Sequence, residues 1–205
     1  MFESDLDRDG SSVRLRRREF LLASASAVAG MVLWTLRKPR LVKATTSKEL
    51  PQEVTIVQFS DSGKRLKKVR VPLVVKTEDE WRRELSPNSF EITRHAGTEI
   101  AYTGNYWNLH QKGLYRCICC ENALFSSDTK FDSGTGWPSF WAPIAPENIR
   151  TKSDVTFGMV RTAASCTECA AHLGHVFDEG PEPTHLRYCM NSASLRFVTA
   201  ISSSG

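Results

Sequence analysis

The sequence predicts a mainly β domain with short helices on its N-terminal side and a pair of metal-binding knuckles. From residue 102 onward the apolar stretches are short, rich in β-branched and aromatic residues, and separated by Gly, Asn and Pro. The best strand patterns cover residues 113–117, 155–162 and 186–198. Two Cys-x-x-Cys pairs, far apart in the sequence, have the spacing of ligands to one metal ion.

Two helix starts precede the strand-rich region. Thr77 and Glu80 have the spacing of a capping box, in which each residue bonds the backbone N–H of the other. The proline after Ser86 ends this first helix and opens a second one over residues 87–94. Both helices are short, so the fold depends on the strands that follow.

The composition divides the chain into three parts. Residues 1–44 form a leader, residues 45–76 hold a polar linker and an accessory β-hairpin, and residues 77–200 form the main domain. The hairpin strands are expected over 54–59 and 69–75, on either side of a Ser-Asp-Ser-Gly turn. With 205 residues, 40% of them hydrophobic, and a mean hydropathy of -0.32, the chain is soluble overall and can bury one real core.

The leader has the layout of an export signal. Arg17-Arg18-x-Phe20-Leu21 resembles the twin-arginine type, and an apolar run over 20–36 follows it. A span of the bilayer needs ~20 residues, so this run is marginal, and both cleavage and retention as a membrane anchor stay open. We expect a protein that is periplasmic, or anchored and facing the periplasm, and cytoplasmic if the leader is not functional.

The charge distribution excludes some partners. The net charge is +4, and much of the basic excess lies before residue 50. This is an asymmetry of one end and not a basic face on the domain. We therefore expect no nucleic-acid partner, and membrane contact only through the leader.

The two cysteine pairs predict one structural Zn²⁺. Cys117 and Cys120 form the first knuckle, and Cys166 and Cys169 form the second. Four thiolates suit zinc, and such a site joins two distant parts of one domain. The alternatives are two disulfides or four unrelated thiols.

Three further stretches suggest an activated thiol in a stiff pocket. Residues 130–140 combine glycines, a proline and three aromatic rings, residues 172–178 contain two histidines, and residues 187–191 contain a cysteine outside the metal set. In a strand, positions 187, 189 and 191 share one face. The candidate catalytic residues are Cys189, His172, His175, Asn191 and Arg187, and the candidate substrate-binding residues are Trp137 and Phe140.

Residues from about 78 to 198 resemble the B-type peptide methionine sulfoxide reductases, the MsrB family, which reduce the R epimer of methionine sulfoxide. The resemblance implies a mainly antiparallel β fold of the MsrB type, with zinc bound by the four paired cysteines and Cys189 as nucleophile. It rests on segments that occur in the family's order: 97–99, 115–117, 130–140, 172–178 and 187–191.

The resemblance and the residue chemistry together imply a mechanism. Cys189 attacks the sulfoxide sulfur while His172 or His175 supplies a proton to the oxygen. Arg187 favours the thiolate, Asn191 places a hydrogen bond or a water on the oxygen, and Trp137 packs against the S-methyl group. The products are methionine and a Cys189 sulfenic acid.

Two departures from the family pattern affect recycling and the rim of the pocket. Thr135 stands where many relatives carry a resolving cysteine, and the only other spare thiol, Cys119, lies inside the first knuckle. An external thiol reductant is therefore expected, thioredoxin-like or a membrane thiol relay. His185 replaces the family's usual glycine before Leu186.

The sequence leaves alternatives to the reduction of methionine sulfoxide in oxidised proteins or peptides, or as the free amino acid. A non-catalytic zinc-held β module that binds a partner protein is one, because a fold alone does not set a function. A metal-dependent hydrolase needs an open zinc position, which four cysteine ligands do not leave.

Overall fold

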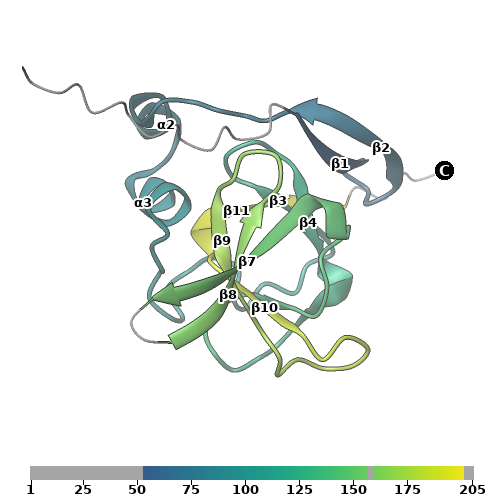
Figure 1. Cartoon of the computed structure of the whole chain (residues 1–205). Coiled ribbons are helices and arrows are strands. Elements are labelled where there is room, and N and C mark those ends of the chain that lie inside the picture. Colours follow the sequence, from purple (N-terminus) through teal and green to yellow (C-terminus); the bar gives the residue numbers. More distant parts are fainter. Residues whose placement is uncertain (1–52, 157–158, 201–205) are drawn as a thin grey trace, which may run out of the picture. The chain divides into compact units, whose positions relative to one another are not determined.

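The structure is a computed structural model that describes residues 53–156 and 159–200 (Figure 1). The predicted leader (1–44) and the polar linker before the hairpin lie outside the described residues. Among the described residues, no helix has the length and apolar character needed to cross a membrane. The described elements are β1 (Glu53–Phe59), β2 (Arg65–Pro72), α2 (Glu78–Glu84), α3 (Pro87–His95), β3 (Gly113–Cys117), β4 (Ala123–Ser126), η1 (Ser127–Thr129), β5 (Lys130–Phe131), β6 (Ser139–Phe140), η2 (Pro146–Asn148), β7 (Ile149–Thr156), β8 (Met159–Cys166), β9 (His172–Phe177), β10 (Arg187–Met190), η3 (Ser192–Ser194) and β11 (Leu195–Thr199).

The strands form three antiparallel sheets, which confirms the predicted mainly β, antiparallel fold class. The largest sheet has the order β5-β6-β10-β9-β8-β7, the second has the order β11-β3-β4, and β1 pairs with β2 in a hairpin. Strand β10 is therefore in the interior of the six-stranded sheet, with β6 on one side and β9 on the other.

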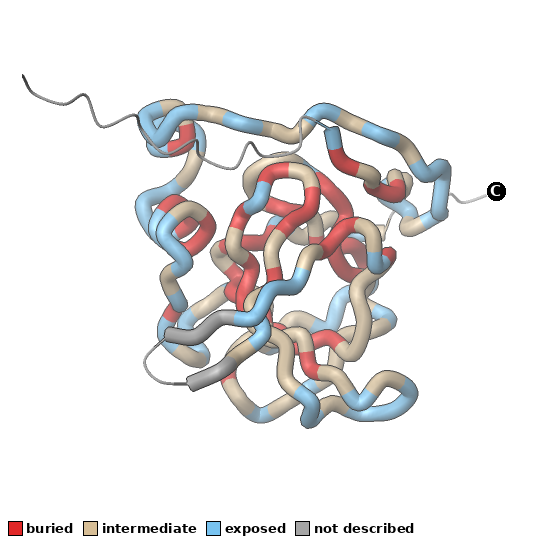
Figure 2. The backbone as a smooth tube through the Cα atoms, viewed as in Figure 1, coloured by how far each residue is buried: buried red, intermediate tan, exposed pale blue. Residues whose placement is uncertain are grey.

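The core joins the three-stranded sheet to one face of the six-stranded sheet. Tyr115 and Phe125 contribute from the first, and Phe140, Leu173 and Met190 from the second, and all five are fully buried. The rings of Phe125 and Phe140 stack with centroids 4.3 Å apart. Figure 2 shows the buried residues gathered between these strands. Since one face of the large sheet packs in this core, alternate residues of its strands project from the opposite face.

Both predicted helix starts are confirmed. Thr77 caps α2, its Oγ1 accepts a hydrogen bond from the Glu80 N–H at 3.3 Å, and its own N–H donates to the Glu80 carboxylate at 2.7 Å. Ser86 caps α3, with Pro87 at the first helical position. Trp81 and Phe90 bury the inner faces of these helices.

The strand predictions are confirmed in part. Residues 113–117 form β3 as expected, but the run over 155–162 is wrong as a single strand, because Thr156 pairs with Met159 across a hairpin. The run over 186–198 is also wrong as one strand, since the chain leaves the large sheet after β10, forms η3 and enters the other sheet as β11. In both cases the strand-like composition continues through a point where the chain turns back on itself or passes from one sheet into another.

A buried amide helps to fasten the hairpin to the rest of the described chain, beside contacts such as that of Arg116 with the end of β1. Asn148 is fully buried, and its side chain accepts a hydrogen bond from the Val57 N–H at 2.7 Å. It also donates to the carbonyls of Val57 at 2.8 Å and Ala123 at 2.7 Å. Strand β1 was predicted within a residue, whereas β2 begins earlier than predicted, at Arg65.

Candidate functional site

The two cysteine knuckles have the same backbone geometry. Each begins at the last residue of a strand, Cys117 of β3 or Cys166 of β8. The carbonyl of that cysteine accepts a hydrogen bond at 3.0 Å from the N–H four residues on, of Glu121 or Ala170. Both of these residues have a positive φ, 65° and 56°. Each knuckle is thus a tight turn that directs two sulfur atoms toward the other pair.

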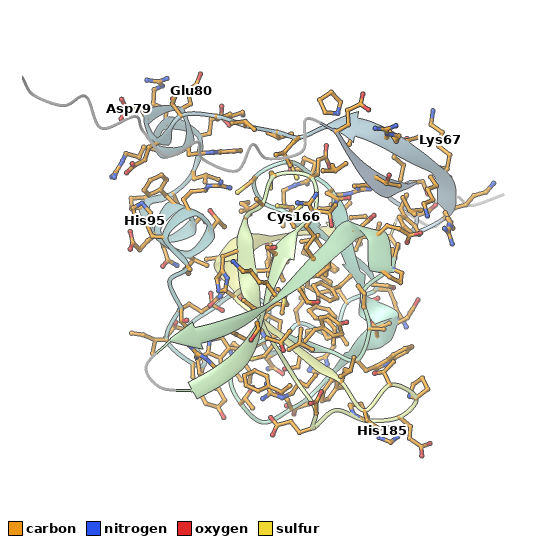
Figure 3. The ribbon with its side chains drawn as sticks, in the orientation of Figure 1. Lys67, Asp79, Glu80, His95, Cys166 and His185 are labelled. Atoms are coloured by element: carbon orange, nitrogen blue, oxygen red, sulfur yellow. The ribbon has the colours of Figure 1, made fainter. Side chains whose placement is uncertain are left out.

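The four sulfur atoms fit one zinc ion. All lie within 4.8 Å of one another, with Cys117 Sγ 3.5 Å from Cys169 Sγ and Cys120 Sγ 3.6 Å from Cys166 Sγ. A tetrahedral ion with Zn–S bonds of about 2.3 Å requires sulfur atoms about 3.8 Å apart. A disulfide would require about 2.05 Å, and all four thiols are free. The geometry therefore supports zinc over two disulfides, and Figure 3 shows Cys166 inside the molecule.

Cys119 belongs to the metal-binding region and not to the thiol site described next. It is half-buried in the turn of the first knuckle. Its sulfur faces Thr93 and Arg94 of α3 and the thiols of Cys117 and Cys169.

The register of the large sheet places Cys189 in a row of polar side chains. Cys189 of β10 pairs with Ser139 of β6 on one side and with His175 of β9 on the other. Directly paired residues project from the same face of a sheet, with Cβ atoms about 5 Å apart. Ser139, Cys189 and His175 therefore lie side by side on the face opposite the core.

A β-bulge brings the second histidine to this face. Ser165 of β8 pairs with His172 and Ala164 pairs with Gly174, so Leu173 is an extra residue in β9. An extra residue shifts the alternation of side chains by one, and His172 consequently shares a face with His175. Their rings are 5.2 Å apart and edge to face.

The bulge also needs the glycine beside it. A Cβ on Gly174 would lie 2.1 Å from the carbonyl oxygen of Cys189. Only a residue without a side chain lets β9 approach the cysteine strand at this point.

Charged and polar groups surround the Cys189 thiol. Burial raises its pKa above the ordinary value, while Arg187, Thr135 and Ser139 each lower it in part. Arg187 is itself buried and is held by the Glu179 carboxylate, which accepts from its Nε at 3.0 Å and from its Nη2. Arg187 thus favours the thiolate, as the sequence predicted, but burial has the larger effect and the net change in the pKa of Cys189 is upward.

The Arg187 guanidinium is positioned to meet charge on sulfur. It lies over the Phe177 ring, 4.5 Å from the centroid, which fixes its plane. Its Nη1 is buried without a hydrogen-bond partner among the described residues. The guanidinium also interacts with the Cys189 sulfur, so it can stabilise negative charge there.

Three linked hydroxyl groups lie at the thiol, and two of them, those of Ser133 and Ser139, were not predicted from the sequence. Ser133 Oγ lies 2.8 Å from both Thr135 Oγ1 and Ser139 Oγ, and Ser139 also donates to the Trp137 carbonyl at 3.2 Å. Thr135 and Ser139 reach the Cys189 sulfur. Single serines in a loop carry no sequence signal of this kind; only the pairing of β6 with β10 reveals them.

The structure does not support Phe140 as a substrate-binding residue. Strand residues alternate between faces, so Ser139 faces Cys189 while Phe140 faces the core and is fully buried. Trp137, the other substrate-binding candidate, is half-buried, and its indole N–H donates to the Glu99 carbonyl at 3.1 Å. This bond holds the ring of Trp137 at the edge of the loop.

Asn191 lies just beyond the strand that carries Arg187 and Cys189, so strand periodicity does not decide its face. Strand β10 ends at Met190, and Asn191 is the N-cap of η3. Its buried amide accepts from the Glu99 N–H at 3.0 Å and donates to the Leu173 carbonyl at 3.1 Å. These contacts fit a positioning role rather than contact with substrate.

Glu99 connects the parts of the site, and its importance was missed from the sequence. Its carboxylate is buried and accepts hydrogen bonds from the N–H groups of Ser192 at 2.6 Å and Ala193 at 3.0 Å, at the start of η3. Its backbone bonds Asn191 through the N–H and Trp137 through the carbonyl. The only signal was its place in the segment 97–99 that carries part of the family resemblance.

Comparison with known proteins agrees with this geometry. The family model described as the SelR domain matches residues 85–199. A Synechococcus protein named peptide methionine sulfoxide reductase MsrB is 61% identical over 121 residues, which cover 59% of this chain and 89% of the relative. Proteins of the same name from Herminiimonas arsenicoxydans and Acinetobacter baumannii are 54% identical over 124 residues and 59% identical over 126 residues. These matches cover 60% and 62% of this chain and 90% and 91% of those relatives.

Proposed function

Because this chain belongs to the SelR-domain family of MsrB peptide methionine sulfoxide reductases, we propose that it reduces the R epimer of methionine sulfoxide in oxidised proteins and peptides. The observation that carries the proposal is the row formed by Ser139, Cys189 and His175, with Arg187 on the same face. A non-catalytic zinc module has no need of a thiol placed among proton donors.

The first step transfers oxygen from the substrate to the enzyme. The Cys189 sulfur attacks the electrophilic sulfoxide sulfur as a proton reaches the sulfoxide oxygen. The S–O bond of the substrate then breaks, methionine leaves, and Cys189 becomes a sulfenic acid. The substrate sulfur gains two electrons and the cysteine sulfur loses two, so the step is balanced.

The proton donors follow from the geometry. His175 lies directly opposite Cys189, and His172 stacks edge to face on His175, so the pair can supply a proton and be reprotonated in turn. Arg187 stabilises the thiolate as it forms. Trp137 offers an apolar surface to the S-methyl group, and Asn191 holds Glu99 and η3 in place.

An external thiol completes the cycle. One donor thiol attacks the Cys189 sulfenic acid and releases water, and a second donor thiol then displaces Cys189, which returns as a thiol while the donor becomes a disulfide. Thr135 contacts the Cys189 sulfur where a resolving cysteine would have to stand, and Cys119 lies among the zinc ligands. Both placements support an external donor, thioredoxin-like or a membrane thiol relay.

Zinc holds the fold and takes no part in the chemistry. Cys117, Cys120, Cys166 and Cys169 supply all four ligands, which leaves no open position for a substrate. When bound, the ion stabilises the folded state by joining the ends of β3 and β8.

The place of action follows from the leader. The motif at Arg17 and Arg18, together with the apolar run after it, supports export, so that the enzyme and its thiol donor act in the periplasm or at the membrane facing it. Replacing both arginines with lysine is expected to retain the protein in the cytoplasmic fraction. Unchanged fractionation would argue against the twin-arginine route.

The proposed nucleophile is tested by Cys189→Ser in the full chain. Sulfoxide reduction is expected to be lost, while zinc content and melting temperature stay as in the wild type. Cys119→Ser is the matched control, because it removes the only other thiol outside the zinc set, and it is expected to keep turnover. A Cys189→Ser protein that still reduces methionine sulfoxide would place the nucleophile elsewhere.

The recycling step has its own test. Reduced enzyme is given substrate without a thiol donor and then treated with a sulfenic-acid probe. We expect the probe on Cys189, mapped by mass spectrometry. A stoichiometric disulfide between Cys119 and Cys189 would contradict the external route.

A further inference from the structure

The segment from Glu99 to Tyr102 lies along the loop that carries Trp137. The Glu99 carbonyl accepts a hydrogen bond from the Trp137 indole at 3.1 Å, and the Tyr102 N–H donates to the Gly136 carbonyl at 2.8 Å. The Tyr102 hydroxyl donates to the Gly134 carbonyl at 2.5 Å. Ile100 is therefore fixed between two points of attachment at the edge of the site.

The fit between this segment and the loop is close. A Cβ on Gly136, whose φ is +85°, would lie 2.7 Å from the Tyr102 N and ring. The Tyr102 ring also packs edge to face on Trp107, with centroids 5.2 Å apart. The position of this segment is thus determined by the same loop that brings Thr135 to Cys189.

Two large apolar side chains of this segment face solvent. Ile100 is 76% exposed and Tyr102 is 55% exposed. Among the described residues, the other exposed large hydrophobic residues are Leu66 and Val75, which lie in the hairpin strand β2 and the segment after it. Two rigidly held apolar groups beside a reaction centre are better explained as a binding surface than as an unused surface.

We propose that Ile100 and Tyr102, here called the substrate rim, bind an apolar side chain next to the methionine sulfoxide in an extended peptide. This inference rests on the proposed function and narrows its protein and peptide substrates to those with apolar residues beside the methionine sulfoxide. Methionine is commonly buried among apolar residues in folded proteins, so a damaged or unfolded segment presents its sulfoxide beside such side chains. The rim supplies an apolar contact for the neighbour while Trp137 contacts the methyl group.

The experiment compares two peptides of R-methionine sulfoxide, one flanked by leucine and one flanked by glycine. The measured quantity is the ratio of kcat/KM for the leucine peptide to that for the glycine peptide. The wild type is expected to favour the leucine peptide by about tenfold, the effect of partly burying one aliphatic side chain. Ile100→Ser and Tyr102→Ser are expected to bring this ratio close to one, mainly through KM.

Two controls separate the rim from general effects. Val75→Ser removes an aliphatic side chain that is 70% exposed outside the rim, and it is expected to keep the wild-type ratio. Tyr102→Phe keeps the ring and loses only the hydrogen bond to Gly134, so it is expected to keep most of the preference.

The outcomes distinguish the rim from the reaction itself. A ratio that stays at the wild-type value in Ile100→Ser and Tyr102→Ser, or that falls equally in Val75→Ser, overturns the rim while the reductase activity stands. Wild-type protein that turns over neither peptide refutes the proposed function, and the rim with it.

Discussion

Glu99→Gln tests whether one buried carboxylate holds the site together. The exchange keeps the size and shape of the side chain but turns one oxygen into an NH₂ group. In the native structure the two oxygens accept from the N–H groups of Ser192 and Ala193, and the residue is 7% exposed. The variant therefore leaves one buried N–H of η3 facing another donor.

The expected cost of this change can be worked from these contacts. A hydrogen bond to a charged group contributes about 1.5–3 kcal/mol to stability, and leaving a buried donor unsatisfied costs about 1–3 kcal/mol. Both figures describe the loss of the same bond, so they are not added. We expect the free energy of unfolding to fall by about 2–3 kcal/mol, which lowers the melting temperature by about 5–10 °C. Since Asn191 and Trp137 bond the backbone of Glu99, kcat/KM is expected to fall at least tenfold at temperatures where the variant is folded.

The assay is urea unfolding followed by kinetics on R-methionine sulfoxide below the transition. Glu121→Gln is the matched control, because Glu121 pairs with Arg196 at the surface with about half of its side chain exposed. Such a pair contributes about 1 kcal/mol or less, so little change is expected there. An unfolding free energy of Glu99→Gln within 0.5 kcal/mol of the wild type would refute the reasoning.

Three further predictions address the metal, the thiol and the backbone. Cys117→Ser is expected to lose zinc by elemental analysis and to melt far below the wild type, and active folded protein without zinc would contradict a structural ion. Because burial raises the pKa of Cys189, the thiolate fraction and kcat/KM should keep increasing with pH beyond the ordinary thiol range. Arg187→Met removes a charge that lowers this pKa, so it should move the rise in kcat/KM to still higher pH. A shift of the rise to lower pH would contradict the role of Arg187. His185 is exposed and has a φ of 59°, a left-handed backbone conformation that is strained for a residue with a Cβ (Figure 3). His185→Gly is therefore expected to raise the free energy of unfolding, measured in urea, by up to about 1 kcal/mol. A fall of that size would argue against backbone strain at this position.

The features that were predictable from the sequence depend on local spacing. The zinc ligands occur in two pairs, and within each pair the cysteines are three positions apart. The turn of each knuckle is complete within six residues, so the pattern can be recognised without knowledge of the fold. The helix caps at Thr77 and Ser86 are local in the same sense. Cys189 was identified as the candidate nucleophile for two reasons: it belongs to neither cysteine pair, and its neighbours in the sequence are polar.

The features that were not predictable depend on register. Adjacent strand residues face opposite sides of the sheet, so a shift of one residue in register would exchange Ser139 and Phe140 at the thiol. Only the pairing of β6 with β10 shows that Ser139 faces Cys189. His172 and His175 share a face because of a bulge that composition does not signal. Glu99 meets Ser192 across 93 residues of sequence, and no short motif announces such a contact.

The central claim is that this chain reduces one epimer of methionine sulfoxide through Cys189. The most direct measurement supplies the purified R and S epimers separately, with dithiothreitol as the reductant, and follows the appearance of methionine. The account predicts turnover of the R epimer alone, and its loss in Cys189→Ser. Equal turnover of both epimers, or of neither, would contradict it.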